Sequence, residues 1–230
     1  EKDNNIVAQV DTQYWEDIVI DVSRIFLSNE SILDASVSVN LSADRQFFCS
    51  TEGAQLIQNK NAAFISINAS IRADDKTSIP LYKTYFAFDP EGLPSKEELI
   101  KEATSILAML EELKSAPIAE PYSGPAILHP RASGVFFHEI FGHRIEGHRL
   151  KSETDGQTFK EKVEEQILPE MLSVQLDPTL RNFKNQDLIG YYSFDDEGVK
   201  ARKVNVVENG KLQTFLMSRS PLEEIDHSNG

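Results

Sequence analysis

The sequence predicts an α+β protein: an antiparallel sheet with helices packed on one face, followed by the start of a second, mixed α/β domain that carries a metal-binding helix. Three observations predict this. A helical apolar pattern over residues 14–27 gives way to alternating strand patterns from residue 35 onward. A second helical pattern then precedes a proline-rich stretch. Beyond it, His138, Glu139 and His143 lie within one short segment, and these residue types are common zinc ligands.

The first helix and the sheet are predicted from the spacing of apolar residues. One helical face carries Trp15, Ile18, Val19, Val22, Ile25 and Phe26. The alternating patterns that follow predict strands over 35–42 and 46–50, joined by a turn at Ala43-Asp44-Arg45, and further strands over 55–58, 62–71 and 81–88. Together they predict a sheet built from hairpins with one solvated face.

The second helix begins at a capping box, with Ser95 as the cap and Glu98 three residues later. Its buried stripe is predicted to be Leu99, Ile100, Ala103, Ile106, Leu107, Leu110 and Leu113. Pro117 and Pro121 end it. We therefore predict an N-terminal α+β domain over 1–116 and a metal-helix region over 117–230.

Composition excludes several classes of partner. The formal charge is −14, which argues against nucleic acid or an anionic membrane surface as the main partner. No apolar run approaches the roughly 18 residues that a membrane span needs. Cys49 is the one cysteine, so no internal disulfide can form. We expect a cytoplasmic protein. Because the chain begins at Glu1 and not at Met, an exported form with a removed signal peptide is the alternative.

The spacing of the two histidines departs from the familiar zinc helix, in which they lie four residues apart. His138 and His143 are five apart, and a regular helix would set their rings roughly 140° apart on different faces. Both can bind one ion only if the helix is distorted, for example by a π-type turn, which Gly142 would make easier. Ser133 is a possible helix cap. The alternative is two unrelated histidines, one half-buried and one exposed.

The surrounding segments carry a family resemblance. In order along the chain they are Tyr122-Ser123-Gly124-Pro125, His138-Glu139-x-x-x-His143 with Phe141-Gly142 inside it, Glu146-Gly147, Asp195-Asp196-Glu197-Gly198, Glu208-Asn209-Gly210 with Phe215-Leu216, and Ser228-Asn229-Gly230. This series resembles the TldD/PmbA metallopeptidases, also known as modulators of DNA gyrase. Residues 1–115 are similar only in layout, with Ser50-Thr51-Glu52-Gly53 the best local match.

The resemblance implies a mechanism. His138 and His143 would be ligands of Zn²⁺, and Glu139 would be the general base that takes a proton from the attacking water. In the family a cysteine thiolate from the C-terminal half is the third ligand, but no cysteine follows Cys49 here. The sequence is therefore expected to be the N-terminal part of a longer chain with an incomplete metal site. The resemblance also implies a homodimer, or a heterodimer with a related subunit.

Several neighbouring residues have two readings each. His148 could be a third ligand or a solvated loop histidine. Glu146 could orient a histidine ring or lie in water, and Arg149 could bind a peptide carboxylate or be solvated. The acidic run 195–197 could bind a cation or form a turn. The Asn209-Gly210 hairpin could leave an edge to which an extended peptide adds as a strand.

These observations favour a zinc metallopeptidase that cleaves unfolded or extended peptides. The first alternative is a non-catalytic partner subunit or peptide-binding module of a TldD/PmbA-like complex. The second is a metal-dependent hydrolase of another small amide.

Overall fold

A computed structural model describes residues 10–154, 157–220, 222, 225 and 227–229. The chain divides into two compact units, Glu1–Pro121 with Asn182–Ile189, and Tyr122–Arg181 with Gly190–Gly230. The predicted domain boundary after residue 116 stays a prediction. The division by contacts falls after Pro121 and assigns 182–189 to the first unit, which no sequence pattern indicated. Gly230, the last residue of the predicted family motifs, lies outside the described residues.

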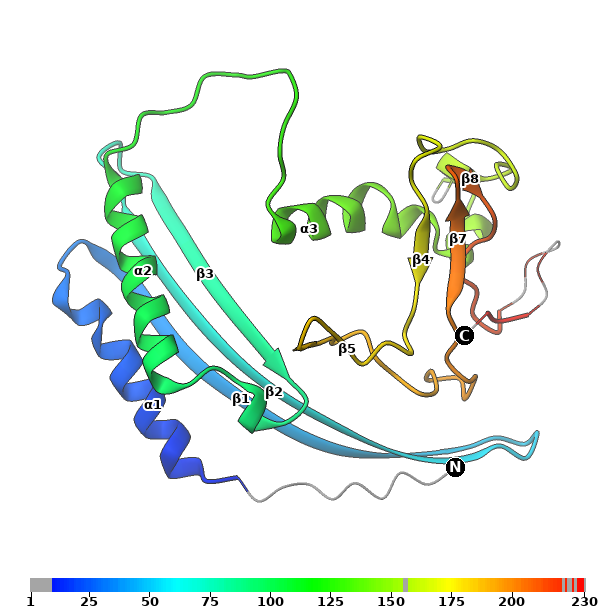
Figure 1. Ribbon diagram of the computed structural model, residues 1–230, viewed down its shortest axis with the longest axis horizontal. Coiled ribbons are helices and arrows are strands. Elements are labelled where there is room, and N and C mark those ends of the chain that lie inside the picture. Colours follow the sequence, from blue (N-terminus) through cyan, green and yellow to red (C-terminus); the bar gives the residue numbers. More distant parts are fainter. Residues whose placement is uncertain (1–9, 155–156, 221, 223–224, 226, 230) are drawn as a thin grey trace. The chain divides into compact units, whose positions relative to one another are not determined.

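The first unit is a three-stranded antiparallel sheet with two helices on one face (Figure 1). The strands β1 (Ile32–Cys49), β2 (Gln55–Arg72) and β3 (Ser78–Ala87) lie in that order. The helices are α1 (Thr12–Arg24) and α2 (Lys96–Lys114), and short 3₁₀ turns cover Phe26–Ser28 and Pro90–Gly92. A small hairpin, β5 (Asn182–Phe183) and β6 (Gln186–Asp187), belongs to the same unit. The predicted antiparallel sheet with helices on one face is confirmed.

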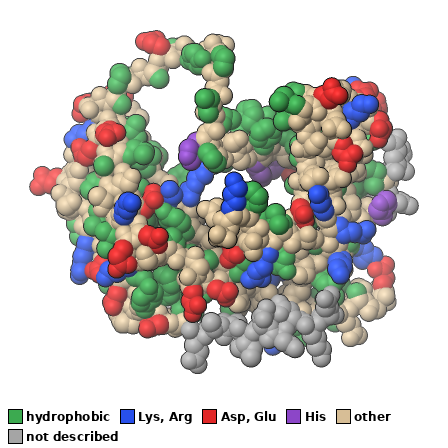
Figure 2. Space-filling model, viewed as in Figure 1, with side chains coloured by type: hydrophobic (Ala, Val, Ile, Leu, Met, Phe, Trp, Pro, Cys, Tyr) green, Lys and Arg blue, Asp and Glu red, His purple; other side chains and the backbone are tan. Residues whose placement is uncertain are grey.

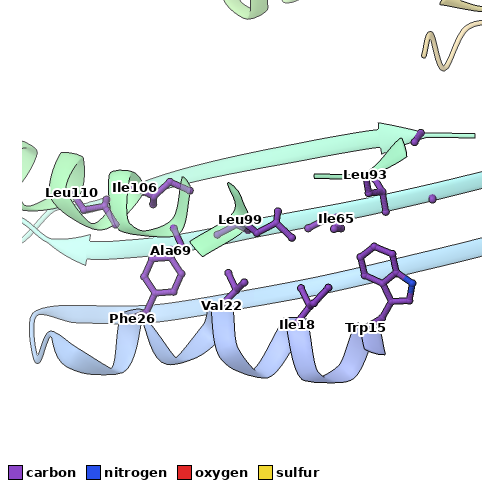
Figure 3. Packing of buried hydrophobic residues seen from close by; sticks show 14 of the residues in the cluster. Trp15, Ile18, Val22, Phe26, Ile65, Ala69, Leu93, Leu99, Ile106 and Leu110 are labelled. Atoms are coloured by element: carbon purple, nitrogen blue, oxygen red, sulfur yellow. The ribbon is translucent and has the colours of Figure 1, made fainter. Parts of the chain in front are cut away.

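The core of this unit lies between β2 and the two helices (Figure 3). Alternate residues of β2 face the helices because side chains of a strand point to opposite faces. Figure 3 shows the side chains of α1 and α2 converging on them. The buried set includes Trp15, Ile18, Val22, Phe26, Ala63, Ile65, Ile67, Ala69, Ile71, Leu99, Ala103, Ile106 and Leu110.

Both helix starts follow from their capping residues. Asp11 accepts a hydrogen bond from the Tyr14 N–H at 3.1 Å. Ser95 and Glu98 form the predicted capping box, in which the Ser95 N–H donates to the Glu98 carboxylate at 2.8 Å. The carboxylate therefore satisfies a backbone donor that the helix leaves unpaired.

The turn predicted at Ala43-Asp44-Arg45 is wrong. β1 runs through these residues without a break, and the hairpin turn comes after Cys49. Ala43 pairs with Asn61, and Arg45 donates a hydrogen bond to the Asn59 side chain at 2.8 Å. Because β3 pairs only with residues 63–72 of β2, the polar part of the β1–β2 hairpin continues beyond it as a two-stranded ribbon (Figure 1). Cross-strand pairing outweighs the local turn preference here.

The second unit combines helix α3 (Pro130–Ile140), three 3₁₀ turns and a small antiparallel sheet. The turns cover Gly142–Arg144, Gly147–Lys151 and Gln157–Phe159, and the sheet order is β4 (Val174–Leu176), β7 (Val204–Glu208), β8 (Lys211–Leu212). Its core comprises Phe141, Ile145, Val204, Val206, Val207, Leu212, Phe215 and Met217.

The hairpin predicted at Asn209-Gly210 is confirmed. Both residues have positive φ, 47° and 79°, as a tight two-residue turn requires. The free edge predicted beside it is wrong. The Glu164 N–H donates to the Leu212 carbonyl at 2.7 Å, and Leu212 donates back to Glu165 at 3.1 Å. The edge that an added peptide would need is therefore already paired.

Candidate metal centre

Helix α3 presents the first two candidate residues near its C-terminal end. It begins at Pro130, with His129 as the N-cap residue, a position that suits proline because the first helical N–H needs no partner. The cap predicted at Ser133 is wrong, since Ser133 lies inside the helix and donates its N–H to the His129 carbonyl at 2.8 Å. His138 and Glu139 are in the last turn, and the helix ends at Ile140.

The helix ends between His138 and His143, and this end, not a widened helical turn, accommodates their five-residue separation. Phe141 leaves the helical region, with φ −125° and ψ −53°. A 3₁₀ turn follows, in which Arg144 donates to Phe141 at 2.9 Å and Ile145 donates to Gly142 at 3.2 Å. The distortion expected from the spacing is present, but the π-type turn is wrong. The break brings the His143 ring back beside His138.

Three side chains converge at this break. One ligand atom from each of His138, Glu139 and His143 lies within 4.8 Å of the others. Glu139 Oε1 is 3.9 Å from His138 Nε2, and Oε2 is 4.0 Å from His143 Nε2. The two imidazole rings meet edge to face with centroids 4.4 Å apart. The structure thus brings together all three residues that the sequence singles out, while their roles stay a prediction.

The chemistry of this group suits a divalent metal such as zinc. Neutral imidazole nitrogens and carboxylate oxygens are zinc ligands. The side chains of His138 and Glu139 are 62% and 63% exposed, and that of His143 is 37% exposed. The group is therefore open to an ion and to a substrate. Among the described residues no other group of three potential ligands lies as close together.

A second interaction fixes the His143 ring through its Nδ1 atom. Its Nδ1 is 2.7 Å from Glu146 Oε1, and the Arg149 Nε donates to the other carboxylate oxygen at 2.5 Å. Of the two readings of Glu146, the structure supports contact with a histidine ring. Arg149 pairs with this carboxylate, which sequence reasoning missed. The available signal was the three-residue spacing from His143 to Glu146 and on to Arg149.

The electrostatics of Glu146 favour its ionised form. Partial burial raises the pKa of the carboxyl, but the hydrogen bonds and charges of Arg149 and His143 outweigh it, so the pKa lies below its ordinary value. The ionised form of Glu146 is thus favoured, with Arg149 donating to one carboxylate oxygen and His143 Nδ1 beside the other.

The other sequence candidates lie outside this group. His148 is 64% exposed, with Nε2 3.8 Å from Glu146. Asp195 accepts hydrogen bonds from the N–H groups of Glu197 and Val199 at 2.9 and 2.8 Å, which is the geometry of a turn. Cys49 is an exposed residue at the end of β1, in the first unit.

The surface shows no segregation of charge in the view of Figure 2, where acidic and basic side chains of the described residues are interspersed. Hydrophobic side chains also reach this surface. The exposed hydrophobic side chains of α3 include Val135 at 60% exposure and Phe136 at 44%. None of the helices in the described part of the chain has the length and hydrophobicity of a membrane span.

Comparisons with known proteins show which families and structures the chain resembles. Residues 121–230 match the family model of the PmbA/TldA metallopeptidase C-terminal domain. The chain is 28% identical over 220 residues to Metalloprotease MJ0996 of Methanocaldococcus jannaschii, covering 95% of this chain and 46% of that protein. It is 29% identical over 178 residues to the Zinc metalloprotease TldD homolog of Saccharolobus solfataricus, covering 75% and 37%.

A solved structure has the same fold. It is a putative modulator of DNA gyrase from Bacteroides thetaiotaomicron, with a TM-score of 0.73, 16% identity, and coverage of 91% of this chain and 45% of that one. The chain thus spans less than half the length of each of these proteins. Two independent lines, the sequence match over the second unit and the fold match over both units, agree. The comparisons support the TldD/PmbA family, whose C-terminal domain model matches residues 121–230.

Proposed function

We propose that this chain carries the metal-binding and proton-transfer residues of a zinc-dependent peptidase that cleaves unfolded or extended peptides. His138 and His143 would hold the zinc ion, and Glu139 would be the general base. The observation that carries the proposal is the convergence of the three ligand atoms within 4.8 Å, in a chain for which the comparisons support the TldD/PmbA family.

The three side chains have complementary tasks. His138 and His143 would bind the ion through neutral imidazole nitrogens. A bound zinc ion would polarise the scissile carbonyl and lower the pKa of the attacking water. Glu139, about equally distant from both histidines, would take a proton from that water and give it to the leaving amine. Its exposure leaves room for an extended chain, whereas a folded protein would present few extended peptide bonds.

A complete site needs one more protein ligand, because catalytic zinc sites usually have three. The family resemblance implies a cysteine thiolate, and Cys49 lies in the first unit. We therefore propose that a third ligand, other than His148 and Cys49, completes the centre. A homodimer or a heterodimer with a related subunit, and a cytoplasmic location, belong to the same proposal.

The discriminating experiment is the Glu139→Gln substitution, introduced into the whole natural protein. The variant should keep its zinc, because the histidines are intact, and lose about 10²- to 10⁴-fold in kcat/KM toward an unfolded peptide. Glu165→Gln is the matched control, since the Glu165 side chain is 54% exposed and its carboxylate forms an ion pair with Lys162 at 2.6 Å.

Three results would contradict a part of this proposal. Undiminished cleavage by Glu139→Gln would overturn the assignment of the base. A wild-type protein with neither zinc nor peptidase activity would be a non-catalytic partner subunit. Hydrolysis of small amides but not of peptides would support the other class of hydrolase.

A further inference from the structure

We propose that Glu146 and Arg149 fix His143 as the Nδ1–H tautomer, so that Nε2 is the nitrogen presented to the metal. This inference rests on the proposed function for its purpose, but the tautomer itself can be measured without any metal. Glu146 and Arg149 are positioning residues that act through His143 and do not contact the ion.

The contact distances set the tautomer. Glu146 Oε1 lies 2.7 Å from His143 Nδ1. A carboxylate oxygen can only accept a hydrogen bond, so an unprotonated Nδ1 at this distance would place two lone pairs against each other. The proton must therefore be on Nδ1. The lone pair is then on Nε2, which is the atom that faces Glu139.

Arg149 keeps the carboxylate in its acceptor state. Its Nε donates to Glu146 Oε2 at 2.5 Å, and this charge-assisted bond orients the carboxylate. A guanidinium nitrogen also lies 3.4 Å from His143 Nδ1. Once Nδ1 is protonated, that contact joins two donors. The shorter contact between Nδ1 and the carboxylate therefore determines where the Nδ1 proton points.

The backbone of Glu146 is held on both sides by the core of the second unit. Leu216 donates its N–H to the Ile145 carbonyl at 2.8 Å, and Gly147 donates to the Leu216 carbonyl at 2.9 Å. Ile145 is 1% exposed. The backbone position of Glu146 is therefore fixed. This favours the contact with the histidine ring over the alternative of a carboxylate in water.

The consequence for the metal follows from the chemistry of imidazole. In water the Nε2–H tautomer is the more populated, and in that form Nε2 has no free lone pair. Hydrogen bonds from a ligating histidine to a carboxylate typically contribute 10- to 100-fold to metal affinity. Removing Glu146 should therefore weaken zinc binding even though neither histidine is changed.

The test is long-range ¹H–¹⁵N NMR of the metal-free chain at a pH about two units above the ordinary histidine pKa. His143 of the wild type should show a protonated-type Nδ1 and an unprotonated-type Nε2. Glu146→Gln and Glu146→Ala should shift His143 toward the Nε2–H form, and Glu146→Asp should restore part of the wild-type pattern. Glu165→Gln should change nothing. A wild-type His143 that is mainly Nε2–H would overturn the inference, and this result needs no variant to fold.

Zinc titration of the same proteins separates this inference from the proposed function. A loss of about 10- to 100-fold in zinc affinity in Glu146→Ala, with the tautomer shift, supports both. A Nδ1–H His143 in a wild-type protein that contains the proposed third ligand and still binds no zinc would refute the metal site and leave the positioning intact. Unchanged zinc affinity together with a shifted tautomer would refute the role of Glu146 in metal binding.

Discussion

Gly147 is a position where a single added methyl group should disturb the packing of the second unit. A Cβ on this residue would lie 2.3 Å from Met217 Sδ and 2.9 Å from the Leu216 carbonyl oxygen. The sulfur can move, although Met217 is only 5% exposed. The carbonyl cannot move freely, because it accepts the Gly147 N–H and its own residue donates to Ile145. Gly147→Ala should therefore cost about 1–3 kcal/mol, and each kcal/mol lowers the Tm of a domain of this size by about 4–8 °C.

The effect should be confined to the second unit. Hydrogen exchange of the β7 amides, Val206 and Val207, should accelerate, while the fluorescence of Trp15, the one tryptophan of the sequence and part of the first core, should report an unchanged transition. Gly134→Ala is the matched control, because no atom beyond its chain neighbours and the nearby backbone of its own helix lies within 4 Å of a Cβ there. In the interior of α3 it should stabilise the helix by roughly 0.5–1 kcal/mol. A Gly147→Ala protein as stable as the wild type would refute the reasoning.

Three further predictions concern the core, the surface and the site. Leu99→Ala, at a fully buried residue, should lower the free energy of unfolding seen by Trp15 fluorescence by about 2–5 kcal/mol, and a loss below 1 kcal/mol would contradict the assigned core. The Lys96 hydrogen bond lowers the pKa of Asp21 below its ordinary value of 3.8, so Asp21 stabilises the fold above that pH and the contribution disappears as pH falls through the lowered pKa. In urea titrations at neutral pH, Asp21→Asn should therefore be less stable than the wild type, and the difference in stability should close below about pH 4. A difference that persists in acid would exclude this pair as its cause. His148→Ala should leave zinc affinity within about twofold of the wild type, since one pairwise contact with a solvated ring contributes little, and a larger loss in a zinc titration would make His148 a ligand.

The helices of the first unit could be predicted because their signals are local. The capping residues Ser95 and Glu98 and the apolar face beginning at Trp15 each depend on neighbours within one or two turns. The length of β1 could not be predicted in the same way. Ala43-Asp44-Arg45 has the composition of a turn, but its conformation is set by pairing with the residues opposite it on β2, which are not adjacent in sequence.

At the candidate metal centre, the sequence indicated the residues and the need for a distorted helix, because a five-residue separation is incompatible with one face. It could not tell a π-type turn from a helix end, since both can satisfy that requirement. The conformation of Phe141 decides it. The contact of Glu146 with His143 depends in turn on the bonds between residues 145–147 and Leu216, which are far apart in sequence.

The central claim is that His138 and His143 bind the same zinc ion. The most direct test is zinc titration with Zn K-edge X-ray absorption of the wild type, the two single His→Ala variants, and Cys49→Ser. The account predicts one ion per chain with two imidazole nitrogens at about 2.0–2.1 Å, loss of one imidazole in each single variant, and no change in Cys49→Ser. Equal zinc affinity and an unchanged spectrum in both single His→Ala variants would contradict it.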